Sequence, residues 1–375
     1  MKKMFFYAML ALGMTAACQK PDVEVENPDL DDNSPVEVVF GVKAPTITVT
    51  KTKAAVEDWK SQTVYVYGFA DDVTAVSDGT ALIYGEGATV GTVSDSDPDA
   101  ADESGLTFGN SKKFYYQVDD VYDFYAYYTG KEEDVTATGR TLTADVTITG
   151  AEDVMIAKTD KATDIANRTS EKTLNESRVY SAYAARRGVH PTLVFEHKLT
   201  RFVFKVVKGE TPSAADHTAD VNVTGISIES YNTGKLDITG NTFTATTTGG
   251  KTWLNSVITD DAYTPTEDAD DSEGMITDLM VFPGDAKMNL KVALEPANAE
   301  GNSNLEEIVI DPMEVVLDAA KIAGTEGATF EAGKKYVVTI TVYSLEEVQV
   351  SASLTEWVEG GETTYDPDEE WDAAA

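Results

Sequence analysis

Residues 330–357 read FEAGKKYVVTITVYSLEEVQVSASLTEW, and this stretch decides the fold because it holds two consecutive strand patterns of different character. Residues 336–343 are apolar or β-branched at every position, so both faces suit burial, as in a central strand of a β-sandwich. The second pattern alternates: Val348, Val350, Ala352 and Leu354 share one face, and Gln, Ser and Thr occupy the other. This one-sided strand is either the edge of a closed sandwich or a strand lent to a neighbouring chain.

The composition supports a large strand-rich protein and argues against one class of partner. With 375 residues, 42% of them hydrophobic, the chain is long enough for two sandwich domains. Short strand patterns recur between Gly-rich and Asp-rich turns, and helical periodicity is scarce. The formal net charge is −36 and no basic stripe is present, which argues against a nucleic-acid partner, since a polyphosphate requires a basic face.

The N-terminal residues predict export. Two lysines precede an uncharged run over residues 4–17, which is shorter than a membrane-spanning helix and has the length of the hydrophobic region of a signal peptide. The run ends in Thr-Ala-Ala before Cys18, the only cysteine of the chain. This ending is similar to a bacterial lipoprotein signal, so we expect residues 1–18 to be a signal whose Cys18 is lipidated; an ordinary secretory signal is the alternative. Residues 19–35, rich in Asp, Glu and Pro, are expected to form an acidic tether.

Two further landmarks divide the remaining chain. Val36, Val38, Phe40 and Val42 alternate with other residues, so the first folded element is expected to be a strand with a break. Farther along, residues 193–207 read LVFEHKLTRFVFKVV, in which the apolar positions are odd-numbered up to residue 199 and even-numbered from residue 202. A shift of one position turns every following side chain to the other face of the strand, so we expect a bulge or tight turn at residues 200–201. We also expect this place to be the junction between the two domains.

The chain is therefore predicted to be all-β, with one sandwich over residues 36–190 and a second over residues 191–375. One helix is also predicted in the second half: Asp311 suits its N-cap, Pro312 its first turn and Gly324 its end, and apolar residues recur between them at helical spacing.

No motif predicts catalysis or a bound cofactor. The Gly-Gly-Lys-Thr at residues 249–252 lacks the first Gly of a phosphate-binding loop, because Ala245 stands in its place. The acidic residues at 95, 97 and 99 open like a calcium loop, but the Gly and the bidentate Glu of such a loop are missing; a loose surface calcium site or a solvated loop are both consistent with them. The three histidines share no metal-ligand spacing, and His197 on its apolar face suits a hydrogen-bonded core residue. We therefore expect no catalytic residue, no cofactor and no metal.

Taken in order, these pieces resemble the fimbrillins, the pilus subunits of Bacteroidetes. The resemblance rests on the lipoprotein signal, a Thr-Lys-Ala turn after the first strand, Trp59 before VYVYGF, and the blocks YDFYAYYTG, EDVMIA, VFEHKLTRFVFKV, FEAGKKYVVTITVY and LTEWVEGG. It implies two transthyretin-like β-sandwich domains in tandem, export as an outer-membrane lipoprotein, and a structural role in a cell-surface fimbria that supports adhesion.

The resemblance also implies how such a chain assembles. A protease removes the N-terminal strand, here Val36 to Thr50, and the uncovered groove accepts a strand from the next subunit. Processing in the family usually follows an Arg, but the first Arg of this chain is Arg140, so Lys51 and Lys53 are the implied processing sites. The implied donor strand contains Val348, Val350, Ala352 and Leu354. The implied partners are other fimbrial subunits, the outer membrane through the lipid anchor, and a receptor on a host or bacterial surface.

A different class of function stays open at this point. A surface glycan-binding lipoprotein also uses β-sandwiches, and it would stack Tyr125, Tyr127 and Trp253 on sugar rings. The same aromatic residues equally suit a hydrophobic core.

Overall fold

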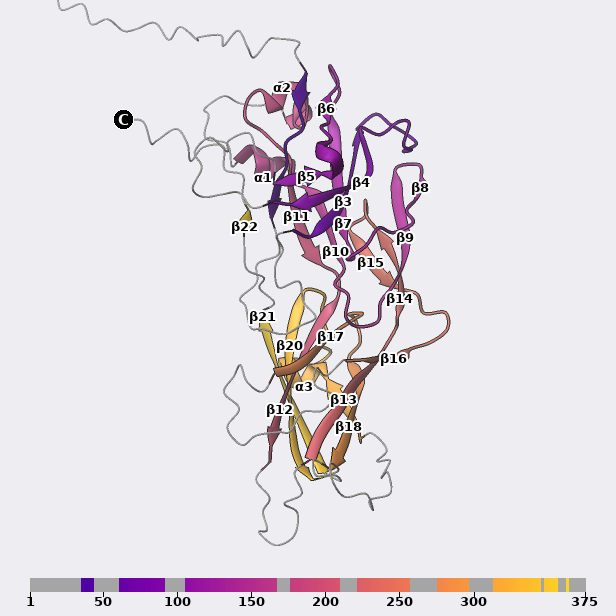
Figure 1. The fold of residues 1–375 in the computed structure, drawn as a ribbon, viewed down its shortest axis with the longest axis vertical. Helices are drawn as coiled ribbons and strands as arrows, with labels where there is room; N and C mark the ends of the chain where they lie inside the picture. The colour runs from indigo at the N-terminus through magenta and orange to yellow at the C-terminus, as the bar shows by residue number, and fades with distance from the viewer. Residues whose placement is uncertain are drawn as a thin grey trace, which may run out of the picture. The chain divides into compact units, whose positions relative to one another are not determined.

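The computed structural model of the chain is drawn in Figure 1, and it describes residues 35–43, 61–91, 105–166, 176–209, 221–256, 275–296, 313–344, 347–356 and 362–363. Residues from Pro35 onward belong to one compact unit. Strands dominate the described residues and the helices are short, which confirms the prediction of an all-β protein. Within these ranges no helix has the length and apolar character needed to cross a membrane.

The largest sheet has eight strands. In spatial order they are β22 (Glu362–Thr363), β2 (Gly41–Lys43), β11 (Thr192–His197), β10 (Met155–Thr159), β7 (Tyr122–Tyr128), β3 (Thr63–Ala70), β4 (Ile83–Val90) and β5 (Leu106–Phe108). All neighbours are antiparallel except β2 and β11, which run parallel. The N-terminal segment and a C-terminal segment therefore lie side by side at one edge of this sheet.

Three four-stranded sheets and one two-stranded sheet complete the fold. The first has the order β15 (Thr242–Ala245), β14 (Thr233–Asp237), β9 (Thr141–Thr147), β8 (Thr136–Thr138). The second has the order β17 (Met275–Val281), β12 (Thr200–Lys208), β20 (Lys334–Ser344), β21 (Glu347–Glu356). The third has the order β16 (Thr252–Asn255), β13 (Val221–Ser230), β18 (Lys287–Pro296), β19 (Met313–Asp318). The short pair is β1 (Val36–Glu37) with β6 (Tyr115–Tyr116).

The helices are single turns or little more. They are α1 (Lys161–Ala166), α2 (Ala182–Ala185) and α3 (Ala319–Ala323), with 3-10 turns η3 (Gly109–Ser111) and η4 (Glu176–Arg178).

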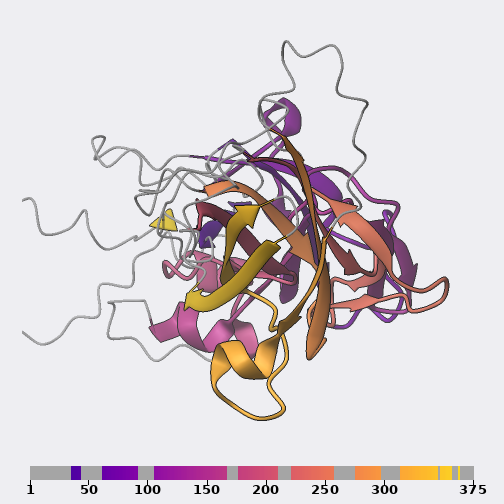
Figure 2. The same ribbon diagram turned by 90° about the horizontal axis from the view of Figure 1, so that it is seen from below.

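Two hydrophobic clusters lie on the two faces of the eight-stranded sheet. On one face, Val64, Val66 and Phe124 pack with the N-terminal segment and with residues around α2. On the other face, Phe69 and Tyr127 pack with β9 and β14, and the same cluster continues between β12 and β20 on one side and β13 and β18 on the other. Figure 2 shows the yellow strands β20 and β21 beside the orange strands of the facing sheet. Because both faces of β3 and β7 are covered, their sequences are apolar or aromatic at nearly every position.

The predicted change of face is found, but the break between the strands is at Lys198 and Leu199, and Thr200 and Arg201, where a bulge or turn was predicted, already belong to β12. β11 ends at His197 and β12 begins at Thr200, and the two strands belong to different sheets. Phe195 packs in one cluster and Phe202 in the other.

The two halves of the chain share sheets. β11 pairs with β10 and β2, and β14 pairs with β9 from the first half. The division into sandwiches over residues 36–190 and 191–375 stays a prediction.

The predicted helix starting at Asp311 was wrong over most of its length. Residues 313–318 form strand β19, which pairs along β18, and only Ala319–Ala323 are helical. Asp318 caps the helix by accepting a hydrogen bond from the Ala320 N–H at 3.1 Å, and Gly324 ends it with φ +67° as predicted. Pairing with β18 decides the conformation of the first half, because strand preference depends on neighbours more than on local pattern. Asp311 and Pro312 lie outside the described residues.

Candidate functional site

The candidate site is the position that residues 36–43 occupy in the core. Val38, Phe40 and Val42 are at most 3% exposed, although the three ladders of the segment, β1 with β6, β2 with β11 and β2 with β22, are only two or three residue pairs long. Isolated backbone bonds complete its pairing: the Val38 N–H donates to the Phe114 carbonyl at 2.8 Å, and the Phe40 carbonyl accepts from the Gly105 N–H at 2.7 Å. A short segment whose ladders are each two or three residue pairs long therefore supplies three buried core side chains.

The surroundings of this segment are apolar and largely aromatic. The Phe40 ring meets the edge of Phe124 at 5.1 Å between centroids and that of Phe108 at 6.1 Å. Leu106 and Leu193 belong to the same cluster. A strand with alternating apolar residues matches such a lining, because every second side chain points into it.

Close backbone approach restricts one residue of the segment. The Gly41 N–H donates to the Pro191 carbonyl at 3.0 Å, and a Cβ placed on Gly41 would lie 2.9 Å from Thr192 Oγ1. Any strand that replaced β2 beside β11 would therefore need a small residue at this place.

A buried carboxylate holds the start of β11, against which β2 pairs. Asp164 Oδ2 accepts a hydrogen bond from the Tyr180 hydroxyl at 2.5 Å and a second from the Thr192 N–H at 2.9 Å. Desolvation raises the pKa of Asp164, and these two hydrogen bonds oppose that rise. The pKa of the neighbouring Tyr116 is also raised, first by burial and then by the charge of Asp164. Asp164 thus acts as a positioning residue for the strand next to β2.

The predicted donor strand is paired within its own chain. β21 is hydrogen-bonded to β20 along its whole length, from Lys334 opposite Glu356 to Ser344 opposite Glu347, and it forms the edge of its sheet. Ala352 packs against the larger cluster and Ser353 is exposed, so the predicted one-sidedness holds at these two positions. The backbones of Val348, Val350 and Leu354 are described, but their side chains are not.

The other predicted site residues fall outside the structure. Cys18, Lys51 and Lys53 lie outside the described residues. Within those residues, no group of three His, Cys, Asp or Glu side chains is arranged to hold a metal ion.

The aromatic residues considered for glycan binding are used in packing. Tyr127 is buried and stacks on Tyr65 with centroids 5.3 Å apart, and Tyr125 stacks on Phe69 at 5.5 Å. Trp253 lies beneath Lys291, whose Nζ is 4.0 Å from the ring centroid. The buried ring of Tyr127 is not available to a sugar.

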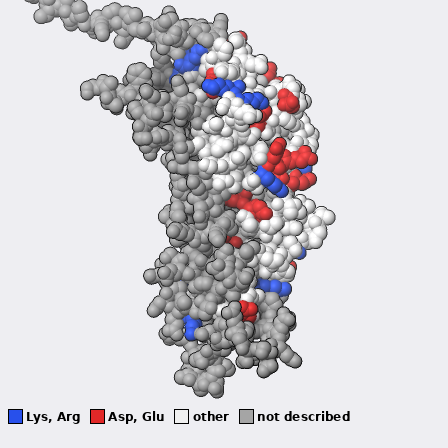
Figure 3. Space-filling view, viewed as in Figure 1, with Lys and Arg blue, Asp and Glu red and all other residues white. Residues whose placement is uncertain are grey.

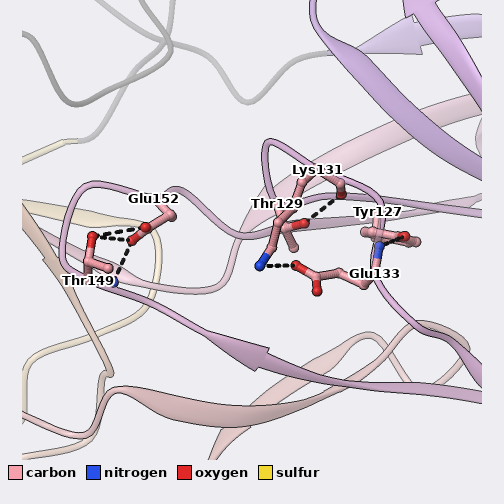
Figure 4. Close-up of polar contacts among 6 residues, drawn as sticks. All are labelled: Tyr127, Thr129, Lys131, Glu133, Thr149 and Glu152. Atoms are coloured by element: carbon pink, nitrogen blue, oxygen red, sulfur yellow. Dashed lines mark hydrogen bonds and ion pairs between the residues drawn. The ribbon is translucent and has the colours of Figure 1, made fainter.

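The hydroxyl of Tyr127 also has a structural partner, as Figure 4 shows. It accepts a hydrogen bond from the Glu133 N–H at 2.8 Å, in the loop that follows β7. In the same loop the Thr129 hydroxyl donates to the Lys131 carbonyl at 2.9 Å, and after β9 the Thr149 N–H donates to Glu152 at 2.6 Å. These contacts fix the two loops that connect the eight-stranded sheet with the sheet of β8 and β9.

A buried histidine–carboxylate contact and a buried ion pair lie near the passage from β11 to β12. His197 Nδ1 is 2.9 Å from Asp153 Oδ2, which agrees with the predicted hydrogen-bonded core histidine. Arg201 contacts Asp278 Oδ2 through Nη2 at 2.7 Å and Nε at 2.9 Å. The Arg201 pair was not predicted; its only signal was a charged residue inside an apolar strand pattern.

Fold and site together define a β-rich protein in which a short N-terminal segment completes the core of a large sheet. The fimbrillin-like family model matches residues 52–357, and the chain belongs to this family. No curated protein matches the sequence.

Several solved structures are similar to this chain. A candidate cell adhesion protein from Bacteroides uniformis is 19% identical, with a TM-score of 0.48 over 86% of this chain and 99% of its own. A fimbrial protein from Bacteroides vulgatus is 14% identical, with a TM-score of 0.46 over 86% of this chain and 100% of its own. A candidate cell adhesion protein from Bacteroides ovatus is 15% identical, with a TM-score of 0.48 over 88% of this chain and 100% of its own.

Proposed function

We propose that this protein is a structural subunit of a cell-surface fimbria, assembled by donor-strand exchange after proteolysis between β2 and β3. One observation carries the proposal: residues 36–43 fill the core with Val38, Phe40 and Val42, yet each of their three ladders, to β6, β11 and β22, is only two or three residue pairs long. Removal of this segment leaves an apolar vacancy, which a strand from another chain can fill by β-augmentation.

The energies indicate that removal is coupled to replacement. Burial of a Val or Phe side chain stabilises by about 1.5 to 3 kcal/mol, so loss of the three side chains removes about 5 to 9 kcal/mol. Typical domains are stable by about 5 to 15 kcal/mol in total. A processed subunit without a donor is therefore close to unfolding and binds a replacement strand strongly.

The donor in this proposal is β21, with Val348, Val350, Ala352 and Leu354 entering the vacancy. To act in trans, β21 must first leave β20, whose pairing over ten residues contributes on the order of 10 kcal/mol if each net hydrogen bond adds about 1 kcal/mol. The loss in one subunit and the gain in the next are similar in size. Exchange is thus expected to be slow and to depend on prior proteolysis.

The remaining features of the proposal concern export and processing. The leader delivers the chain to the outer membrane with a lipid on Cys18, and cleavage after Lys51 or Lys53 separates the N-terminal segment. The assembled fimbria then presents its subunits to a receptor on another surface. The lipoprotein-like leader and the family match support these steps of the proposal, which involve residues outside those that the structure describes.

Assembly in vitro tests the proposal. The purified full chain is treated with a lysine-specific protease, and SDS-resistant ladders are scored on unheated gels. Ladders are expected for the wild type and not for the Lys51→Ala/Lys53→Ala variant. If the wild type loses its N-terminal segment and stays monomeric, the proposed function is wrong.

A matched pair of substitutions tests the donor. Ala352→Asp places a charge on the buried face of β21, and Ser353→Asp places the same charge on its exposed face. We expect Ala352→Asp to abolish ladders and Ser353→Asp to leave them unchanged, with a thermal melt of each monomer to show that both are folded. Ladders of normal length from a folded Ala352→Asp chain assign the donor to another segment.

A further inference from the structure

Two arginines enclose one tyrosine beside the start of β11. The Cζ atoms of Arg178 and Arg187 lie 4.0 Å and 3.6 Å from the centre of the Tyr183 ring, so the two guanidinium groups are no more than about 8 Å apart. Tyr183 packs its body against the cluster that contains the N-terminal segment, and Arg187 Nη1 donates to the Tyr183 carbonyl at 3.0 Å. The two positive charges are therefore held on a fixed support.

This arrangement is unusual in so acidic a chain. Arg140 and Arg201 each pair with an aspartate at 2.8 Å or less. By contrast, neither Arg178 nor Arg187 forms an ion pair with a carboxylate among the described residues, although the chain has 65 Asp and Glu. Figure 3 shows blue side chains at the upper end of the view, over the region where Figure 1 labels α2. Two like charges held this close attract an anionic group.

The register of β22 directs an acidic segment of the same chain toward these arginines. Glu362 lies opposite Lys43 and Thr363 opposite Val42, so β22 runs in the direction from Lys43 toward Gly41. Gly41 pairs with Thr192, five residues after Arg187. β22 thus runs toward the end of the sheet at which β11 begins, five residues after Arg187.

The residues that follow β22 carry the charge opposite to that of the arginine pair, and their extended length is sufficient to reach it. Residues 366–372 read DPDEEWD and carry five carboxylates and one Trp. The nine residues from Thr363 to Asp372 span up to about 30 Å when extended, and the five from Arg187 to Thr192 span at most about 17 Å. The acidic segment is therefore long enough to reach both guanidinium groups.

We propose that Arg178, Tyr183 and Arg187 bind the acidic segment 366–372 of the same chain. Arg178 and Arg187 make charge-assisted hydrogen bonds to its carboxylates, and Trp371 stacks on a guanidinium group. The docked segment retains β22 on β2. The proposed function requires that β2 is removed. When β2 is removed, β22 loses its partner strand, so the C-terminal end is released at the same time as the apolar vacancy opens.

Cleavage of the tail in the full, unprocessed chain tests the docking. Chymotrypsin cuts after Tyr365 and Trp371, and its products are followed by intact mass at low ionic strength. We expect Arg178→Glu/Arg187→Glu to speed cleavage at these sites about five- to tenfold. The same acceleration is expected for the wild type in 1 M NaCl, where the screening length falls to about 3 Å.

A charge swap and a matched control make the test specific. Asp368→Lys/Glu369→Lys/Glu370→Lys in the tail should restore slow cleavage to the arginine double variant. Lys235→Glu/Lys321→Glu changes the net charge equally at two exposed positions elsewhere, and should cleave like the wild type.

Three outcomes overturn the proposal. Equal cleavage rates for the wild type and the arginine variant show that the tail is not docked there. Acceleration by the lysine control shows a general charge effect. Protection that grows with protein concentration assigns the tail to a neighbouring copy. The assay uses unprocessed monomer, so its result is independent of whether ladders form.

Discussion

At the scale of single residues, Phe40 is the side chain on which the candidate site depends most. It is fully buried and meets two aromatic rings edge-on. We expect Phe40→Ala to lower the free energy of unfolding by about 3 to 5 kcal/mol, because the large cavity collapses only in part. Urea unfolding measures the change. Val118→Ala, at a residue 66% exposed, is the control and should stay within about 0.5 kcal/mol of the wild type.

Asp164 gives the site a pH dependence whose direction follows from its burial. Desolvation raises its pKa in the folded protein, so the folded state keeps this proton to a higher pH than the unfolded chain does. Ionisation of the Asp164 carboxyl group therefore destabilises the folded state progressively as the pH rises from about 4 through the raised pKa. At lower pH the group is protonated in both states, and this effect vanishes.

Asp164→Asn tests this dependence, because Asn stays neutral and its Oδ1 still accepts from Tyr180 and Thr192. We expect the variant to gain stability over the wild type as the pH rises from about 4 to 7, and to equal it near pH 3 apart from a constant offset. The free energies of unfolding of both chains across this range check the prediction. A difference that does not change with pH would mean that Asp164 titrates normally.

At the scale of elements, the contact between β2 and β11 depends on the absence of a side chain. A Cβ on Gly41 would lie 2.9 Å from Thr192 Oγ1, so Gly41→Ala should destabilise the protein by about 1 to 3 kcal/mol. Thr192→Ala removes the clashing atoms. We expect the double variant to be more stable than the sum of the two single changes predicts, which a double-mutant cycle from urea unfolding would reveal. If the effects of the two single substitutions were additive, contact with the Thr192 side chain would not be the cause of the destabilisation by Gly41→Ala.

The sequence predicted strands correctly where the alternation of apolar and polar residues matched both the burial and the strand pairing in the structure. The parity change between Phe195 and Phe202 marked the passage from one sheet to another, because a strand cannot turn its side chains over without leaving its register. The segment 313–318 was misread as helix, because its apolar spacing satisfied both periods. Only the pairing with β18, distant in sequence, decided between them.

At the scale of the whole molecule, the proposed function requires that the N-terminal segment can be replaced by another strand. A synthetic peptide of residues 35–50, added in excess during proteolysis, is expected to refill the vacancy and to suppress ladders. The same peptide with Phe40→Asp should not, because it brings a charge into an aromatic surrounding. Unheated gels and thermal melts of the processed chain measure the two effects. Ladder formation that ignores the wild-type peptide would show that assembly does not use this vacancy.

The sequence by itself determined the strand-rich class, the change of face after β11, the alternation of the N-terminal segment and the family, because these depend on side-chain periodicity and local order along the chain. Only the tertiary structure decided that β22 lies beside β2, that β21 is already paired with β20, and that two arginines share one tyrosine. Each of these joins residues far apart in the chain or sets the packing of particular side chains. Such contacts are selected by the burial and pairing of the whole fold, and no local pattern carries them.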